Sequence, residues 1–181
     1  MVMNGWDEIF KYTLPALLVL LLAYGLVVRF LRQERWYREQ NNAGERRKDW
    51  IKIKLLAYER IMLFLERINP EHLVMRLASD YPDALRLQQA LLQNIRDEYE
   101  HNLVQQLYVS DAAWQAATDA RNQVVQWINE AARQTDRQAE TPQLATAILQ
   151  LAMQTKNDPI ASAIKTIKDD VRELMESSVL K

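Results

Sequence analysis

An uninterrupted apolar run near the N-terminus constrains this chain more than any other feature. From Tyr12 to Val28, seventeen consecutive residues carry no charge, and most of them are Leu, Val or Ala. Phe30 and Leu31 continue the run past Arg29, whose long aliphatic stem can place its charge at an interface. About 20 residues at a rise of 1.5 Å each match the roughly 30 Å of a hydrocarbon core. The run therefore predicts a transmembrane helix over residues 13–31.

The flanks of this run resemble membrane–water interfaces and predict an orientation. Aromatic residues lie on both sides of it, as in the aromatic belts of membrane proteins. The residues predicted to lie at the two interfaces are Trp6, Tyr12, Arg29, Arg32, Arg35 and Trp36. Since basic residues favour the cytoplasmic side, their excess after the run predicts a short extracytoplasmic N-terminus over residues 1–12 and a cytoplasmic C-terminal part.

A cleaved signal peptide is the alternative reading of the same run. Ala23-Tyr24-Gly25 loosely resembles a small-x-small cleavage site. However, signal peptides begin with a basic segment, whereas Asp7 and Glu8 make this one acidic. Because the apolar run also continues past the possible cut, a retained anchor is favoured.

Charge is distributed unevenly along the chain. Residues 29–54, the basic segment, carry nine Lys or Arg against four Asp or Glu, whereas residues 55–181 carry thirteen against eighteen. A basic segment beside a predicted span favours contact with a lipid bilayer and its anionic head groups. Within it, residues 32–46 are predicted to form a juxtamembrane helix extension and linker. Nucleic acid is not a predicted partner, because acidic residues interrupt the segment and the remainder is acidic.

Two residue types are scarce enough to exclude classes of chemistry. The chain has no cysteine, which excludes disulfides, thiolate nucleophiles and cysteine metal sites. Its three glycines are Gly5, Gly25 and Gly44, so none lies in the last 137 residues. Phosphate-binding loops and nucleophile elbows need glycine where the backbone turns tightly. We therefore predict no catalytic residue, no cofactor and no enzymatic activity.

Apolar spacing and proline positions predict an all-α fold. Asn69-Pro70, Thr141-Pro142 and Asp158-Pro159 each place a capping residue before a proline that can begin a helix. Ser110 is another predicted N-cap, and Asn41–Gly44 is a predicted helix end. The predicted helices cover residues 4–40, 47–68, 70–78, 83–107, 111–136, 142–155 and 159–178.

The soluble part is predicted to be one helical cytoplasmic domain over residues 47–178. Its core is expected from the long apolar stripes of the helices over 47–68, 83–107 and 111–136. Residues 133–141 are polar throughout and are the predicted linker inside this domain.

Few side chains suggest a metal site. Glu98 and His101 form a Glu-x-x-His pair on one helical face, a motif that di-iron bundles use on two helices together with two further glutamates. Only one copy is present, so this pair is a weak metal candidate and an ordinary i,i+3 pair is the favoured interpretation. The acidic residues around Glu98 and at Asp169-Asp170 are interpreted as solvated charge.

The last predicted helix carries a narrow apolar stripe. Its members, which step by four, three, four and three residues, are Ile160, Ile164, Ile167, Val171 and Leu174. A helix covered by a globular core usually has a wider stripe, whereas this spacing suits packing against one partner helix. The partner is left open between this chain and another protomer or protein. We predict that this helix is the least firmly held part of the domain and an interface.

Four short stretches carry a resemblance to a family. They are KYTLPA at residues 11–16, LLAYER at 55–60, FLERINP at 64–70 and EYEHNL at 98–103. Together they resemble an uncharacterised family of short bacterial proteins, each with a single N-terminal span and a helical remainder. The resemblance covers residues 10–130. It implies a bacterial inner-membrane location and no particular mechanism.

These features together favour a membrane-tethered interaction or scaffold protein. Its cytoplasmic helical domain would bind an unidentified protein partner or form a homo-oligomer. The alternative is an accessory subunit of a membrane transport or secretion complex. A helical bundle that binds a metal through carboxylates and histidine ranks third.

Overall fold

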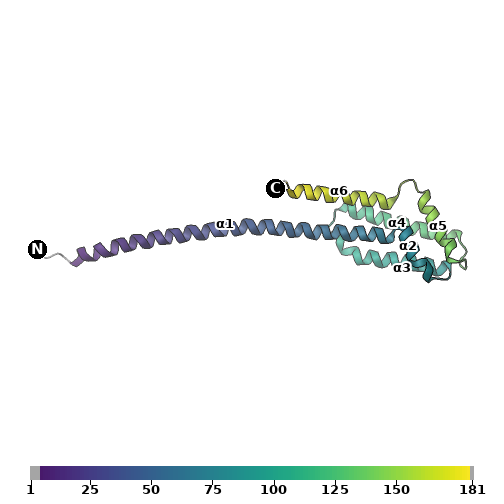
Figure 1. Cartoon of the computed structure of the whole chain (residues 1–181), viewed down its shortest axis with the longest axis horizontal. Coiled ribbons are helices and arrows are strands. Elements are labelled where there is room, and N and C mark those ends of the chain that lie inside the picture. Colours follow the sequence, from purple (N-terminus) through teal and green to yellow (C-terminus); the bar gives the residue numbers. More distant parts are fainter. Residues whose placement is uncertain (1–4, 180–181) are drawn as a thin grey trace. The chain divides into compact units, whose positions relative to one another are not determined.

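The computed structural model describes the backbone of residues 5–179 and the side chains of residues 17–33 and 45–177. This part of the chain is all-α, as predicted. It divides into two compact units, Met1–Trp50 and Ile51–Lys181, which we call the N-terminal unit and the helical bundle. The helices are α1 (Gly5–Ile68), α2 (Pro70–Leu77), η1 (Ala78–Asp80), α3 (Ala84–Asn102), η2 (Leu103–Leu107), α4 (Asp111–Gln134), α5 (Thr141–Gln154) and α6 (Pro159–Val179) (Figure 1).

Helix α1 continues through Asn41–Gly44, so the predicted helix end there is wrong. One glycine inside a helix costs only about 1 kcal/mol relative to alanine. The neighbouring Glu, Gln, Arg and Lys residues favour the helix and outweigh that cost.

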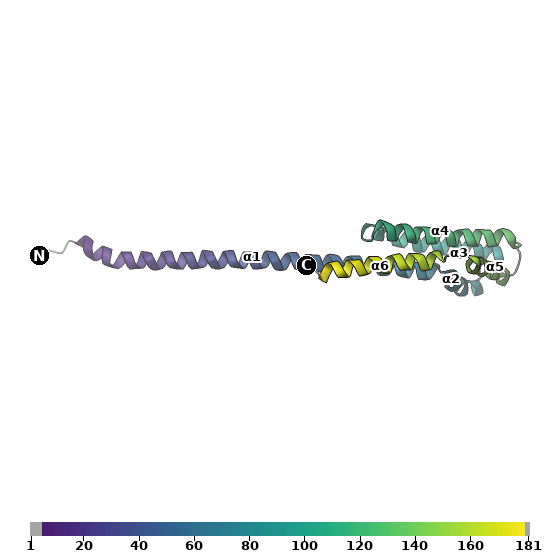
Figure 2. The same ribbon diagram turned by 90° about the horizontal axis from the view of Figure 1, so that it is seen from above.

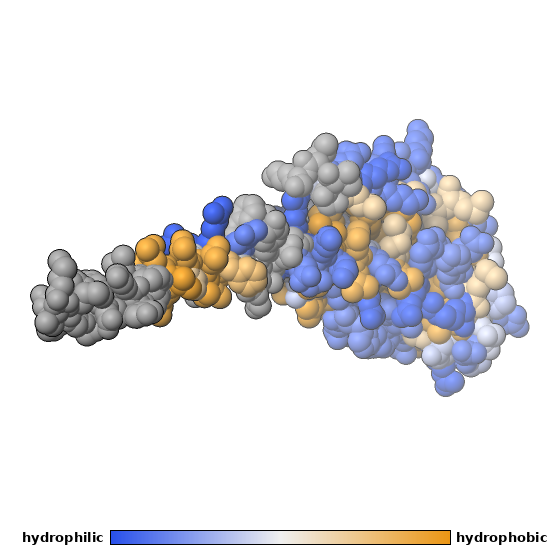
Figure 3. All heavy atoms as spheres, turned by 60° about the vertical axis from the view of Figure 1, so that its left-hand side comes forward, coloured by the Kyte–Doolittle hydropathy of each residue, from blue (hydrophilic) through white to orange (hydrophobic). Residues whose placement is uncertain are grey.

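The N-terminal unit presents an apolar helix surface. Every side chain from Leu17 to Leu22 is more than half exposed, and Figure 3 shows this part of α1 in orange. Among the described residues, no helix combines the length with the apolar character that crossing a bilayer requires. The transmembrane helix predicted over residues 13–31 is therefore wrong for the part of the chain that the structure describes.

The predicted interface residues of that span fall into two groups. Arg29 and Arg32 are exposed. The side chains of Trp6, Tyr12, Arg35 and Trp36 lie outside the described residues.

In the helical bundle, four helices run side by side in alternating directions. They are the part of α1 from Ile51 onward, α3, α4 and α6, and α2 and α5 lie at the end where α1 finishes (Figures 1 and 2). Helix α6 packs along α4 and runs antiparallel to α1. The alternation follows from the short connections between successive helices.

One hydrophobic core holds the bundle together. Fully buried side chains include Ile61, Phe64, Leu65 and Ile68 of α1, Leu87, Leu91 and Ile95 of α3, and Ala113, Ala117, Ala120, Val124 and Ile128 of α4. These residues confirm that the three long helices build the core. The alanines on α4 remove side-chain bulk, which allows neighbouring helices to approach closely.

Three of the four helix caps that the sequence predicted are present in the structure. The Asn69 Oδ1 atom accepts a hydrogen bond from the Glu71 amide at 3.0 Å, and Asp158 Oδ1 accepts one from the Ile160 amide at 2.8 Å. Ser110 Oγ likewise accepts from the Ala113 amide at 3.0 Å. These bonds satisfy amides that a helix start leaves without a partner.

Thr141 departs from this pattern, because it is the first residue of α5 and not its cap. Its hydroxyl donates to the Tyr81 carbonyl at 2.6 Å. The Ala84 amide donates to the Ala139 carbonyl at 2.9 Å. The polar segment before α5, predicted as a linker, is therefore attached to the start of α3.

Candidate protein-interaction groove

The residues of the narrow apolar stripe of α6 fall into two groups, one inside the core of the bundle and one at the edge of that core. Ile160 and Ile167 are buried in the core of the bundle, as is Ala163 between them. Ile164, Val171 and Leu174 are half-buried and pack against that core. The chain's own helices thus cover one side of the stripe. The prediction that the stripe is an interface remains untested, and it now concerns its outer residues.

An apolar groove lies where this outer side of α6 meets α1. It has a volume of about 450 Å³. The groove is lined by Leu55, Tyr58, Glu59, Met62, Leu63, Ile167, Lys168, Val171 and Arg172. All of these residues belong to the helical bundle. Its charged side chains are the acidic Glu59 from α1 and the basic Lys168 and Arg172 from α6. The rest of the lining is mainly apolar.

Helical spacing explains why α1 supplies one wall of the groove. Buried residues of α1, such as Ile61 and Leu65, occupy one face of the helix. Leu55 and Met62 lie at its half-buried edge, and Leu63 is 47% exposed. Leu56, which is 59% exposed, extends the apolar surface outward along α1. The apolar stripe of α1 is therefore wider than the core needs, and its excess faces solvent.

A small polar cluster joins α1, α4 and α6 beside the groove. The Tyr58 hydroxyl donates to Asp170 Oδ2 at 3.1 Å and accepts from the Ser110 amide at 3.1 Å. Ser110 Oγ also hydrogen-bonds to Asp170 Oδ2. Tyr58 is buried, so its hydroxyl needs these partners. The cluster therefore ties α6 to α1 and to the start of α4.

Burial raises the pKa of Tyr58 above its usual value, and the nearby Asp170 carboxylate raises it further, while the Ser110 amide opposes the shift. The folded protein therefore holds this proton more tightly than the unfolded chain does. The resulting stabilisation is fully present below about pH 10, the pKa of an unfolded tyrosine, and is lost as pH rises through the higher folded pKa.

Tyr58→Phe is expected to lower the free energy of unfolding by about 1–2 kcal/mol at neutral pH, because the Ser110 amide loses its partner. The variant should also lose less stability than the wild type above about pH 10. Denaturant unfolding at neutral and alkaline pH measures both effects. Tyr81→Phe is the matched control, since among the described residues the Tyr81 hydroxyl has no hydrogen-bond partner. Equal alkaline losses in wild type and Tyr58→Phe would contradict the account.

Sequence reasoning missed this cluster. The sequence indicates solvated charge at Asp170 and a helix cap at Ser110, and it places Tyr58 within the apolar stripe of the helix over 47–68. The three residues are far apart in the sequence, and Asp170 lies 112 positions after Tyr58. The available signal was a tyrosine inside an apolar stripe, because a buried hydroxyl requires a partner.

The weak metal candidates are used differently in the structure. Arg67 Nη1 donates to both carboxylate oxygens of Glu98, at 2.8 and 3.1 Å. His101 is exposed. Within the described residues, no three His, Asp or Glu side chains gather closely enough to hold a metal ion.

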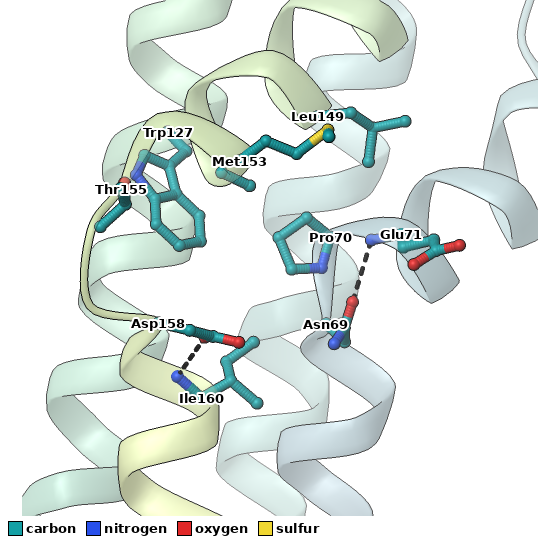
Figure 4. Close-up of a pocket in the computed structure, with 10 residues that line it drawn as sticks. Asn69, Pro70, Glu71, Trp127, Leu149, Met153, Thr155, Asp158 and Ile160 are labelled. Atoms are coloured by element: carbon teal, nitrogen blue, oxygen red, sulfur yellow. Dashed lines mark hydrogen bonds between the residues drawn. The ribbon is translucent and has the colours of Figure 1, made fainter.

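A second cavity, of about 580 Å³, lies where α5 and the start of α6 meet the start of α2 (Figure 4). Trp127, Leu149 and Met153 line it beside Asn69 and Asp158. Figure 4 shows that the last two side chains are engaged in the capping bonds of α2 and α6. Because Asn69, Asp158 and Thr155 already use their side-chain oxygens within the fold, this cavity offers few groups that could orient a ligand.

Comparison with known proteins gives one match. The model of a family of unknown function, DUF7935, matches residues 5–174. The chain belongs to this family. Membership confirms the resemblance to an uncharacterised family, while the bacterial origin that the resemblance implied remains a prediction. No curated protein and no solved structure matches the chain.

Proposed function

We propose that this chain is an interaction protein, a helical scaffold that binds a protein partner in the groove between α1 and α6. The observation that carries the proposal is the apolar character of an open groove on a folded bundle. Exposed apolar patches on a soluble surface usually mark interaction sites. Leu56 and Leu63, both about half exposed, are the apolar side chains that such a partner would cover.

The lining of the groove favours a protein over a small molecule. Small-molecule sites combine apolar walls with a few convergent polar groups. Here the hydroxyl of Tyr58, the buried polar group in the lining, already hydrogen-bonds to Asp170 and to the Ser110 amide. Two helices with an apolar channel between them match the helix-in-groove mode of protein recognition.

Leu56→Asp combined with Leu63→Asp is expected to reduce partner capture by about tenfold or more, because two carboxylates would be desolvated in the interface. The test compares proteins recovered with the tagged full chain in mild detergent. Val104→Asp with Leu107→Asp is the matched control, since these exposed apolar side chains lie on η2, outside the groove. A protein lost only with the groove variant supports the proposal. Identical recovery with wild type and groove variant would contradict it.

A second candidate function, accessory subunit of a larger assembly, is favoured by the exposed segment from Leu17 to Leu31 of α1. A helix that is apolar on all sides is normally buried, and one partner face cannot cover it. We propose that several subunits surround it. Leu20→Asp should then release the chain from a large particle in native sizing. Flotation with phospholipid vesicles and no such particle would show that lipid covers the segment.

Binding of anionic lipid by the basic segment, residues 29–54, also stays a proposal. Arg29, Arg32, Arg46 and Arg47 are exposed charges that such head groups would contact. Binding to anionic vesicles that weakens at high salt would support it.

A further inference from the structure

We infer that the occupant of the groove between α1 and α6 is a second copy of this chain, packed face to face about a two-fold axis parallel to these helices. This inference rests on the proposed function and names its partner.

The shape of the groove suits two copies. Each copy contributes a pair of antiparallel helices, α1 and α6, with an apolar channel between them. When two such channels face each other, their side chains become the interior of a four-helix unit. With the axis parallel to the helices, α1 of one copy lies beside α6 of the other, and every neighbouring pair is antiparallel. Leu63 and Val171 of both copies would meet in that interior.

The charges on the rims of the groove favour a second copy of the chain as the partner and a two-fold axis parallel to α1 and α6. Glu59 lies on the α1 rim and Lys168 on the α6 rim. Both are exposed, and within the described residues neither takes part in an ion pair. An axis parallel to the helices places Glu59 opposite the partner's Lys168, and the reverse contact occurs by symmetry. An axis across the helices would place like charges opposite each other, which is unfavourable.

Charge reversal gives the test, with sedimentation of the full chain in mild detergent as the measurement. The wild type should contain a dimer. Glu59→Lys and Lys168→Glu should each weaken the dimer by about tenfold, because each replaces two attractive contacts by two repulsive ones. The double variant should restore the dimer, and an equimolar mixture of the two single variants should form a mixed dimer. Both side chains are exposed, so the bundle should stay folded, which circular dichroism verifies.

Cross-linking adds a readout of geometry. Since the chain has no cysteine, Glu59→Cys and Lys168→Cys each introduce a single thiol. A mixture of these two variants should form a disulfide between copies more readily than either variant alone. A monomeric wild type, or a double variant that stays as weak as the single ones, would overturn the inference. If groove-dependent capture of another protein persisted in that case, the proposed function would stand with a different partner. If the chain neither dimerised nor captured another protein through the groove, the proposed function would be contradicted as well.

Discussion

Phe64→Ala is expected to lower the free energy of unfolding by about 3–5 kcal/mol. The Phe64 side chain is only 1% exposed, and its ring centroid lies 6.0 Å from that of Tyr99 on α3. Its removal would leave a cavity where α1 meets α3. Because close-packed cores relax only partly around such a cavity, the lost contacts are not recovered. Denaturant unfolding of the full chain measures the difference.

The control for this prediction is an exposed residue of the same helix. Leu56 is 59% exposed, so Leu56→Ala should change the stability by less than about 1 kcal/mol. If Phe64→Ala were no more harmful than Leu56→Ala, Phe64 would not belong to the core and the arrangement of α1 against α3 would be incorrect.

Ile167→Asp is expected to cost at least about 4 kcal/mol, because it places an unpaired carboxylate in an apolar environment and also removes packing. Ile167 is 2% exposed and faces the core that α6 shares with α4. A loss of this size should detach α6 or unfold the bundle. Proteolysis should then cut first within residues 159–177, and the melting temperature should fall.

Lys165→Asp is the control for charge alone. Lys165 is an exposed residue of the same helix, so its replacement should shift the stability by less than about 1 kcal/mol. Equal stability of Ile167→Asp and Lys165→Asp would show that α6 is held outside the core. In that case all residues of the apolar stripe of α6 would be available to bind a partner.

The sequence was most informative where short-range chemistry decides the structure. Asn69 and Asp158 cap helices that begin at the following proline, as their spacing predicted. Such caps depend on residues two or three positions apart, so no tertiary knowledge is needed. Apolar periodicity likewise predicted that the helix over 47–68 contributes to the core, and Ile61 and Phe64 of its stripe are buried there, because a helical stripe of that width has to be covered.

The sequence was least informative where contacts between distant parts of the chain decide the structure. It could not show that Ile160 and Ile167 would be buried while Val171 would stay half-buried at a groove, because the position of α6 depends on contacts with residues 60 and 112 positions away. The Tyr58–Ser110–Asp170 cluster was missed for the same reason. At Asn41–Gly44, the helix-favouring residues on both sides outweigh weak local stop signals.

The most direct test of the account is the reactivity of a thiol placed in the groove. Leu63→Cys introduces one cysteine into a chain that has none, at a position that is 47% exposed in the isolated chain. Val104→Cys does the same on η2, outside the groove. We predict that in native extract the thiol from Leu63→Cys reacts with a maleimide at least about tenfold more slowly than after dilution of the purified chain, whereas the thiol from Val104→Cys reacts at similar rates in both. Equal rates for the groove thiol in both conditions would mean that nothing covers the groove, and would contradict the proposed function.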